Sequence, residues 1–108
     1  MGINSLTEST ETPLMSVSEV KTALENDQVE LVDVRTERER DEFDIGGKHI
    51  PLIEIEDNMD YFSQSGTKVL YCATGNRSAE AIKLIKQKYP NAAVVSLKGG
   101  LKEWEAQI

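Results

Sequence analysis

Cys72, the only cysteine of the chain, precedes Gly75, Arg77 and Ser78 in a short polar loop. Residues 67–71 have the β-branched and aromatic content of a buried strand, and an amphipathic helix is predicted after the loop. Such a loop turns successive backbone N–H groups inward, and the start of the helix adds partial positive charge. Because these groups and Arg77 stabilise a thiolate, Cys72 is expected to ionise easily and to act as a nucleophile.

A competing interpretation of Cys72 is that of a small buried hydrophobic residue at the end of an apolar strand, which is the commoner role of a lone cysteine. The residues that follow Cys72 favour a reactive thiol instead. Only four residues, 73–76, separate Cys72 from Arg77, and Gly75 allows so small a ring to curl tightly. The whole loop therefore predicts a reactive thiolate.

The composition limits the classes of function. A chain of 108 residues suits one domain, and 12 basic against 19 acidic residues give a formal charge of −7. This balance argues against nucleic acid and anionic membranes as partners. We expect no membrane span and no signal peptide, because no apolar run is long enough. A single cysteine forms no internal disulfide, which predicts a reducing, cytoplasmic location, and with one histidine it predicts no zinc site.

Strands and helices are predicted to alternate along the chain. Residues 1–14 are polar and are expected to form a flexible lead-in, with a possible short strand at Leu14 and Met15, before a domain at 15–108. Two capping boxes, Ser16 with Glu19 and Thr36 with Glu39, predict helices to about residue 26 and to residue 43. We interpret most of the charges of the second helix as a solvated face without a role in function. Further strands are predicted at 29–34, 48–52, 67–71 and 92–97, and further helices at 56–62, after the Cys72 loop, and at 101–108.

This order predicts an α/β fold, with a mostly parallel central sheet of about five strands and helices on both faces. Ligands of such sheets gather at the carboxyl ends of the strands. Cys72 directly follows a predicted strand, so the expected fold and the expected chemistry agree.

The loop sequence Cys-x-x-Gly-x-Arg-Ser, which begins at Cys72, resembles the active-site loop of the rhodanese-like family of single-domain sulfurtransferases. The resemblance extends over residues 15–108. It includes Asp33-Val34-Arg35, His49-Ile50-Pro51 and the closing Gly99-Gly100 followed by Trp104. Where the family often has Gly-Ala after His-Ile-Pro, this chain has Leu52-Ile53. Residues 43–52 look more like the rhodanese domains fused to enzymes that activate ubiquitin-like sulfur carriers. These departures concern the sulfur donor and acceptor and leave the expected fold unchanged.

The resemblance implies a role for each matching residue. Cys72 would be the catalytic nucleophile and would carry the transferred sulfur as a persulfide. Asp33 and Arg35 would buttress the site from a neighbouring strand, while His49 and Trp104 would be structural. The loop that binds the persulfide would comprise Ala73, Thr74, Gly75, Asn76, Arg77 and Ser78. For Arg77, a charge at the loop rim and a structural tether are equally open. For Ser78, capping of the helix is favoured over a hydrogen bond to the sulfur.

The implied reaction is a double displacement without a cofactor. Cys72 would take a sulfane sulfur from thiosulfate or a protein persulfide and pass it to an external thiol or another thiophilic acceptor. Two alternatives remain open. One is a Cys-dependent phosphatase or arsenate reductase, whose loop has one more residue between Cys and Arg. The other is a non-catalytic binding module with the same fold.

Overall fold

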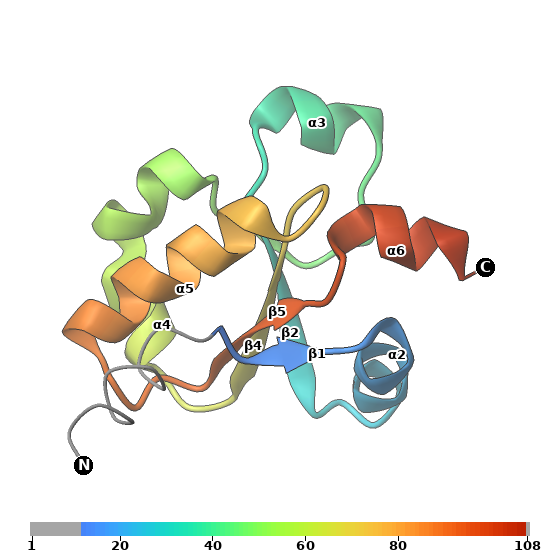
Figure 1. The fold of residues 1–108 in the computed structure, drawn as a ribbon. Coiled ribbons are helices and arrows are strands. Elements are labelled where there is room, and N and C mark those ends of the chain that lie inside the picture. Colours follow the sequence, from blue (N-terminus) through green and yellow to red (C-terminus); the bar gives the residue numbers. More distant parts are fainter. Residues whose placement is uncertain (1–11, 108) are drawn as a thin grey trace, which may run out of the picture.

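Five parallel strands form one sheet through the centre of the protein (Figure 1). The computed structural model describes residues 12–107. The strand order is β1-β5-β4-β2-β3. The strands are β1 (Leu14–Met15), β2 (Val29–Asp33), β3 (Lys48–His49), β4 (Thr67–Tyr71) and β5 (Val94–Leu97). The prediction of a five-stranded parallel sheet is confirmed.

Helices cover both faces of this sheet, as predicted (Figure 1). One face carries the 3₁₀ helix η1 (Leu52–Asn58), α4 (Met59–Ser63) and α5 (Asn76–Lys88). The other face carries α2 (Val17–Glu25) and α6 (Gly100–Ala106). A further helix, α3 (Glu37–Glu42), buries no residue and stands beyond the sheet at the top of Figure 1.

In the central strand β4, the residues from Val69 onwards are all apolar. Val69 and Tyr71 pack on the side of α2 and α6, whereas Leu70 and Cys72 pack on the side of α5. Since neighbouring residues of a strand point to opposite faces, a strand segment covered on both sides favours apolar residues at consecutive positions. The loop that connects β4 to α5 therefore begins inside the core, at Cys72.

Both predicted capping boxes are present. The hydroxyl oxygen of Ser16 accepts a hydrogen bond from the amide of Glu19, and Thr36 does the same for Glu39. In each box the glutamate returns the contact by accepting from the backbone amide of the capping residue. The sequence signature thus fixes where α2 and α3 begin.

Several predicted element limits differ from the structure. The strand expected at 48–52 ends at His49, and from Leu52 the chain turns into η1, after Pro51, which has no amide donor for a strand. The helix expected at 56–62 is extended at its start by this 3₁₀ turn. β5 begins at Val94 rather than at residue 92. Residues 1–11 of the expected lead-in, and residue 108 of the last helix, lie outside the described residues.

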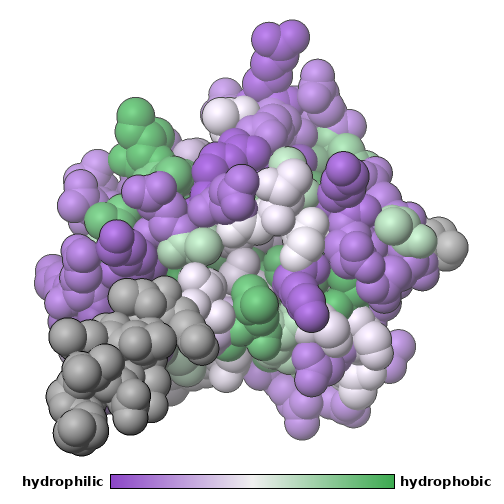
Figure 2. Space-filling model, viewed as in Figure 1, coloured by the Kyte–Doolittle hydropathy of each residue, from purple (hydrophilic) through white to green (hydrophobic). Residues whose placement is uncertain are grey.

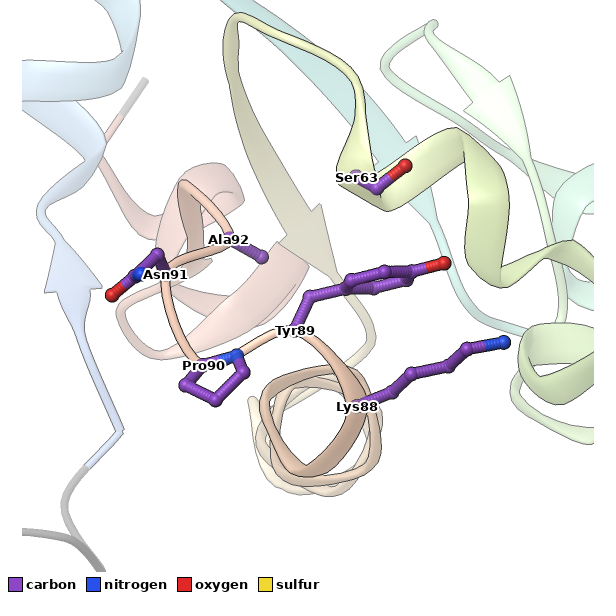
Figure 3. A pocket seen from close by; sticks show the side chains of 6 residues that line it. All are labelled: Ser63, Lys88, Tyr89, Pro90, Asn91 and Ala92. Atoms are coloured by element: carbon purple, nitrogen blue, oxygen red, sulfur yellow. The ribbon is translucent and has the colours of Figure 1, made fainter.

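The amino edge of the sheet holds a pocket of about 270 Å³ (Figure 3). It is lined by Ser63, Lys88, Tyr89, Pro90, Asn91 and Ala92. None of these residues belongs to the Cys72 loop, which follows the other end of β4. On the face drawn in Figure 2, hydrophobic residues are scattered among hydrophilic ones. Among residues 12–107, no helix has the length and apolar character needed to cross a bilayer.

Candidate active site

Cys72 lies at the carboxyl end of β4 with only 1% of its surface exposed. The amide of Gly75 donates a hydrogen bond to its Sγ atom, with the two atoms 3.0 Å apart. Gly75 has a φ of 104°, a left-handed conformation that side-chain-bearing residues rarely adopt, and it is the N-cap of α5. This glycine lets the loop fold back so that its own amide faces the sulfur.

The environment of Cys72 lowers the pKa of its thiol. Burial is the largest influence and raises the pKa, because it disfavours the charged thiolate. The opposing influences are hydrogen bonds from the amide and the hydroxyl of Ser78 and from the amides of Gly75 and Thr74. Together these donors outweigh burial, so the pKa of the thiol lies below its ordinary value, as is expected of a nucleophilic cysteine.

Arg77 binds a carboxylate rather than the sulfur. Its two terminal nitrogens donate to the two oxygens of Glu39, at 2.7 and 2.8 Å. The fork-shaped guanidinium holds both oxygens at once, and this pairing lowers the pKa of Glu39 to about 2. The geometry favours the tether over the free rim charge, since the tether joins the start of α5 to α3.

Most charges of α3 lie on exposed residues, as predicted, but Glu39 is half-buried and makes specific contacts. Its carboxylate closes the capping box of α3 and also holds Arg77, and nearby Arg40 contacts Asp33 at 3.4 Å. The capping box relates residues only three positions apart, so it cannot predict that Glu39 also binds Arg77, 38 residues further along the chain. No signal in the sequence could have identified this contact.

Asp33 and Arg35 form a buried pair at the end of β2, beside β4. The guanidinium of Arg35 donates to both oxygens of Asp33 at 2.9 Å, and the backbone amide of Arg35 adds a third bond. Arg35 also donates to the carbonyl of Phe43, and its own carbonyl contacts Nε2 of His49 at 2.8 Å. These hydrogen bonds join the end of β2 to the residue after α3 and to β3. They also give the ring of His49 a backbone partner.

The turn at Gly99 and Gly100 packs directly on the Cys72 loop. The amides of Leu101 and Lys102 donate to the carbonyls of Cys72 and Ala73, at 2.9 and 3.0 Å. A Cβ atom on Gly100 would lie 2.6 Å from the carbonyl oxygens of both loop residues. Because α6 holds these carbonyls from outside, the loop amides remain free to face the sulfur.

Ser78 does not cap α5, contrary to the prediction. The N-cap is Gly75, and the hydroxyl of Ser78 donates to the Gly75 carbonyl at 3.1 Å. Its oxygen also lies 3.7 Å from the sulfur of Cys72 and 2.6 Å from the hydroxyl oxygen of Ser96. Ser96 was absent from the predicted site. The signal that could have found it is a polar residue inside the otherwise apolar strand β5.

The rim of the loop is formed by Thr74 and Asn76, whose side chains are exposed, and by half-buried Ala73. Of the predicted loop residues, the structure places Thr74, Gly75 and Ser78 against the sulfur, and Arg77 turns to Glu39 instead. Asp33 and Arg35 pair with each other at the neighbouring strand end.

Fold and site define an α/β protein with a single buried cysteine, whose thiol has a lowered pKa, at the carboxyl edge of a parallel sheet. The family model of the rhodanese-like domain matches residues 16–107. The chain belongs to the rhodanese-like domain family.

The similar proteins include named sulfurtransferases. The chain is 38% identical over 81 residues to the probable adenylyltransferase/sulfurtransferase MoeZ of Mycobacterium tuberculosis, which covers 72% of the chain and 20% of MoeZ. The chain thus spans about a fifth of the length of the curated relatives it matches. A rhodanese-like domain protein from Staphylococcus aureus is 29% identical, with a TM-score of 0.74 and coverage of 86% of this chain and 91% of that one.

The human single domain sulfurtransferase TSTD1 has the same fold. It gives a TM-score of 0.76 at 22% identity, with coverage of 91% of this chain and 99% of that chain. At this identity the likeness concerns the fold.

Proposed function

We propose that the protein is a sulfurtransferase that carries a sulfane sulfur on Cys72. The observation that carries this proposal is the set of amides that face the sulfur of Cys72 and lower the pKa of its thiol. The amide nitrogen of Gly75 lies 3.0 Å from the sulfur, and the amides of Thr74 and Ser78 contribute as well. The name of the curated relative MoeZ supports the same reaction class.

In the first step, the Cys72 thiolate attacks the outer sulfur of a donor such as thiosulfate. The sulfur–sulfur bond of the donor breaks, sulfite leaves with the electron pair, and Cys72 keeps the outer sulfur as an anionic persulfide. The amides of residues 73–77 would hold this anion, as an oxyanion hole holds an alkoxide. Asp33 and Arg35 would keep the neighbouring strand end rigid.

In the second step, an external nucleophile takes the outer sulfur and the Cys72 thiolate is restored. Cyanide would leave as thiocyanate, and a thiol acceptor would leave as a persulfide. The acceptor must come from outside because the chain has no second cysteine. We place this cycle in the cytoplasm, where a single reactive thiol stays reduced.

Intact mass tests the cycle. The reduced protein is weighed before and after incubation with thiosulfate, beside Cys72→Ser, and then again after cyanide. We expect a gain of one sulfur atom that is absent from Cys72→Ser and is removed by cyanide. No gain with thiosulfate or with a protein persulfide would overturn the proposal.

Two further assays distinguish the alternatives. Hydrolysis of p-nitrophenyl phosphate that is lost in Cys72→Ser would indicate a phosphatase. A chain that takes no sulfur from any donor, yet binds a partner equally well as Cys72→Ala, would indicate a binding module.

A further inference from the structure

Ser96 is a buried hydroxyl in a position where the strand pattern calls for an apolar side chain. It lies in β5, two residues after Val94, and therefore on the same face of the strand. Val94 packs in the apolar cluster under α5, while Ser96, with 1% of its surface exposed, contacts Ser78 instead. A buried hydroxyl costs stability unless it is hydrogen-bonded, so its partner indicates its role.

The direction of the hydrogen bond between the two serines follows from counting protons. The oxygens of Ser96 and Ser78 are 2.6 Å apart, and Ser78 is the single side-chain partner of Ser96 among the described residues. Ser78 has one hydroxyl proton, which it gives to the carbonyl of Gly75 or to the sulfur of Cys72. If Ser78 donated to Ser96 instead, the hydroxyl proton of Ser96 would have no side-chain acceptor among the described residues, so the proton between the two serines is assigned to Ser96.

The proton of Ser78 can turn to the sulfur without leaving a polar group unpaired. When it does, the Gly75 carbonyl still accepts the amide of Ala79 at 3.1 Å. The Ser78 oxygen still accepts from Ser96. A hydroxyl that accepts a hydrogen bond is a better donor, because a chain of hydrogen bonds polarises its members.

We infer that Ser96 is a positioning residue for the anionic sulfur. By donating to Ser78 from β5, it directs the only proton of Ser78 towards Cys72 and strengthens that donor when the sulfur is charged. This inference rests on the proposed function, since it assigns a second hydroxyl to the same sulfur. It extends the site from the loop that contains Cys72 to a neighbouring strand.

The test is a titration of the thiolate by its ultraviolet absorbance, which is specific because the chain has one cysteine. Ser96→Ala is expected to move the midpoint to higher pH and to slow alkylation by iodoacetamide about threefold below the midpoint, with the rate at high pH unchanged. Ser78→Ala should give a larger change, about tenfold, because it removes the direct donor. In the Ser78→Ala background, Ser96→Ala should add nothing.

Val94→Ala is the matched control, since it removes buried methyl groups from the same face of the same strand. It should lower stability and leave the titration midpoint in place. The inference is overturned if Ser96→Ala leaves the midpoint unchanged, if Val94→Ala moves it equally, or if the Ser96→Ala effect persists without Ser78.

The two proposals fail in different ways. A low midpoint in the unaltered protein that Ser96→Ala does not move would overturn the role of Ser96 alone. A midpoint like that of a free thiol in the unaltered protein would overturn both, because the loop would then stabilise no anion.

Discussion

At the scale of single residues, the ion pair with Glu39 determines where the guanidinium of Arg77, the one arginine of the loop, is held. Both partners are about one-third exposed, so solvent screens their attraction. The bidentate geometry and the capping contacts of Glu39 nevertheless fix the carboxylate between two elements. Arg77 therefore joins the start of α5 to α3, while the hydrogen-bond contacts of the sulfur are with loop amides and with Ser78.

This pair predicts a loss of stability in acid. The pKa of Glu39 is about 2 in the folded protein against the ordinary value of 4.5, so its contribution is complete above about pH 4.5 and disappears as the pH falls towards 2. Glu39→Gln keeps an oxygen for the capping box and removes the charge. We expect it to lower the free energy of unfolding by about 0.5–1 kcal/mol at neutral pH, measured by urea unfolding.

The difference between Glu39→Gln and the unaltered protein should shrink steadily when the unfolding is repeated from pH 4.5 downwards. A difference that stayed constant over this range would mean that the charge of Glu39 contributes nothing and that the substitution acts through the helix cap alone.

At the scale of elements, α6 and the Cys72 loop are joined by backbone contacts that leave no room for a side chain at Gly100. Gly100→Ala would place a Cβ atom 2.6 Å from the carbonyls of Cys72 and Ala73, which must move apart. We expect a loss of about 1–3 kcal/mol in the free energy of unfolding and a slower loading of Cys72 with sulfur. Thermal unfolding and the intact-mass assay measure the two effects.

Gly66→Ala separates backbone strain from this contact. Gly66 also has a positive φ, of 99°, but a Cβ atom there would meet nothing within 4 Å. The strain of the left-handed conformation is thus shared, while the collision with the loop is specific to Gly100. Equal rates of sulfur loading in the two variants would refute a role for α6 in shaping the loop.

The elements could largely be predicted from the sequence because their signals are local. The capping boxes, Pro90 after α5, and the apolar run of β4 each act within a few residues. The contacts of Arg77 with Glu39 and of Ser78 with Ser96 join residues that are 38 and 18 positions apart. They depend on which strands become neighbours, and the order of strands in the sheet is not contained in any local pattern.

At the scale of the whole molecule, the carboxyl and the amino edges of the sheet, where the strands end and begin, hold different kinds of groups. The carboxyl edge gathers Cys72, Asp33 and the Gly99–Gly100 turn, and the sulfur there contacts backbone amides and the hydroxyl of Ser78. The amino edge buries Lys68, which is 1% exposed at the second position of β4. Its ammonium group donates to the carbonyls of Gln64, Ser65 and Gly66 at 3.2–3.3 Å and lies 5.0 Å from the ring centre of Tyr61.

This division predicts that Lys68 serves stability alone. Lys68→Met keeps the buried stem and removes the ammonium group, so three carbonyls lose their donor and water can replace it only in part. We expect the free energy of unfolding to fall by about 1–2 kcal/mol, measured by urea unfolding. The titration midpoint of the Cys72 thiolate should stay where it is, because the change lies at the other end of β4.

Lys88→Met makes the same chemical change on the exposed surface of α5, where the ammonium group lies 5.5 Å from the ring centre of Tyr89. Its effect on stability should stay within about 0.5 kcal/mol, as is usual for surface substitutions. If Lys68→Met shifted the thiolate midpoint while Lys88→Met did not, the two edges would be coupled through β4. The separation of stability and chemistry between the edges would then be wrong.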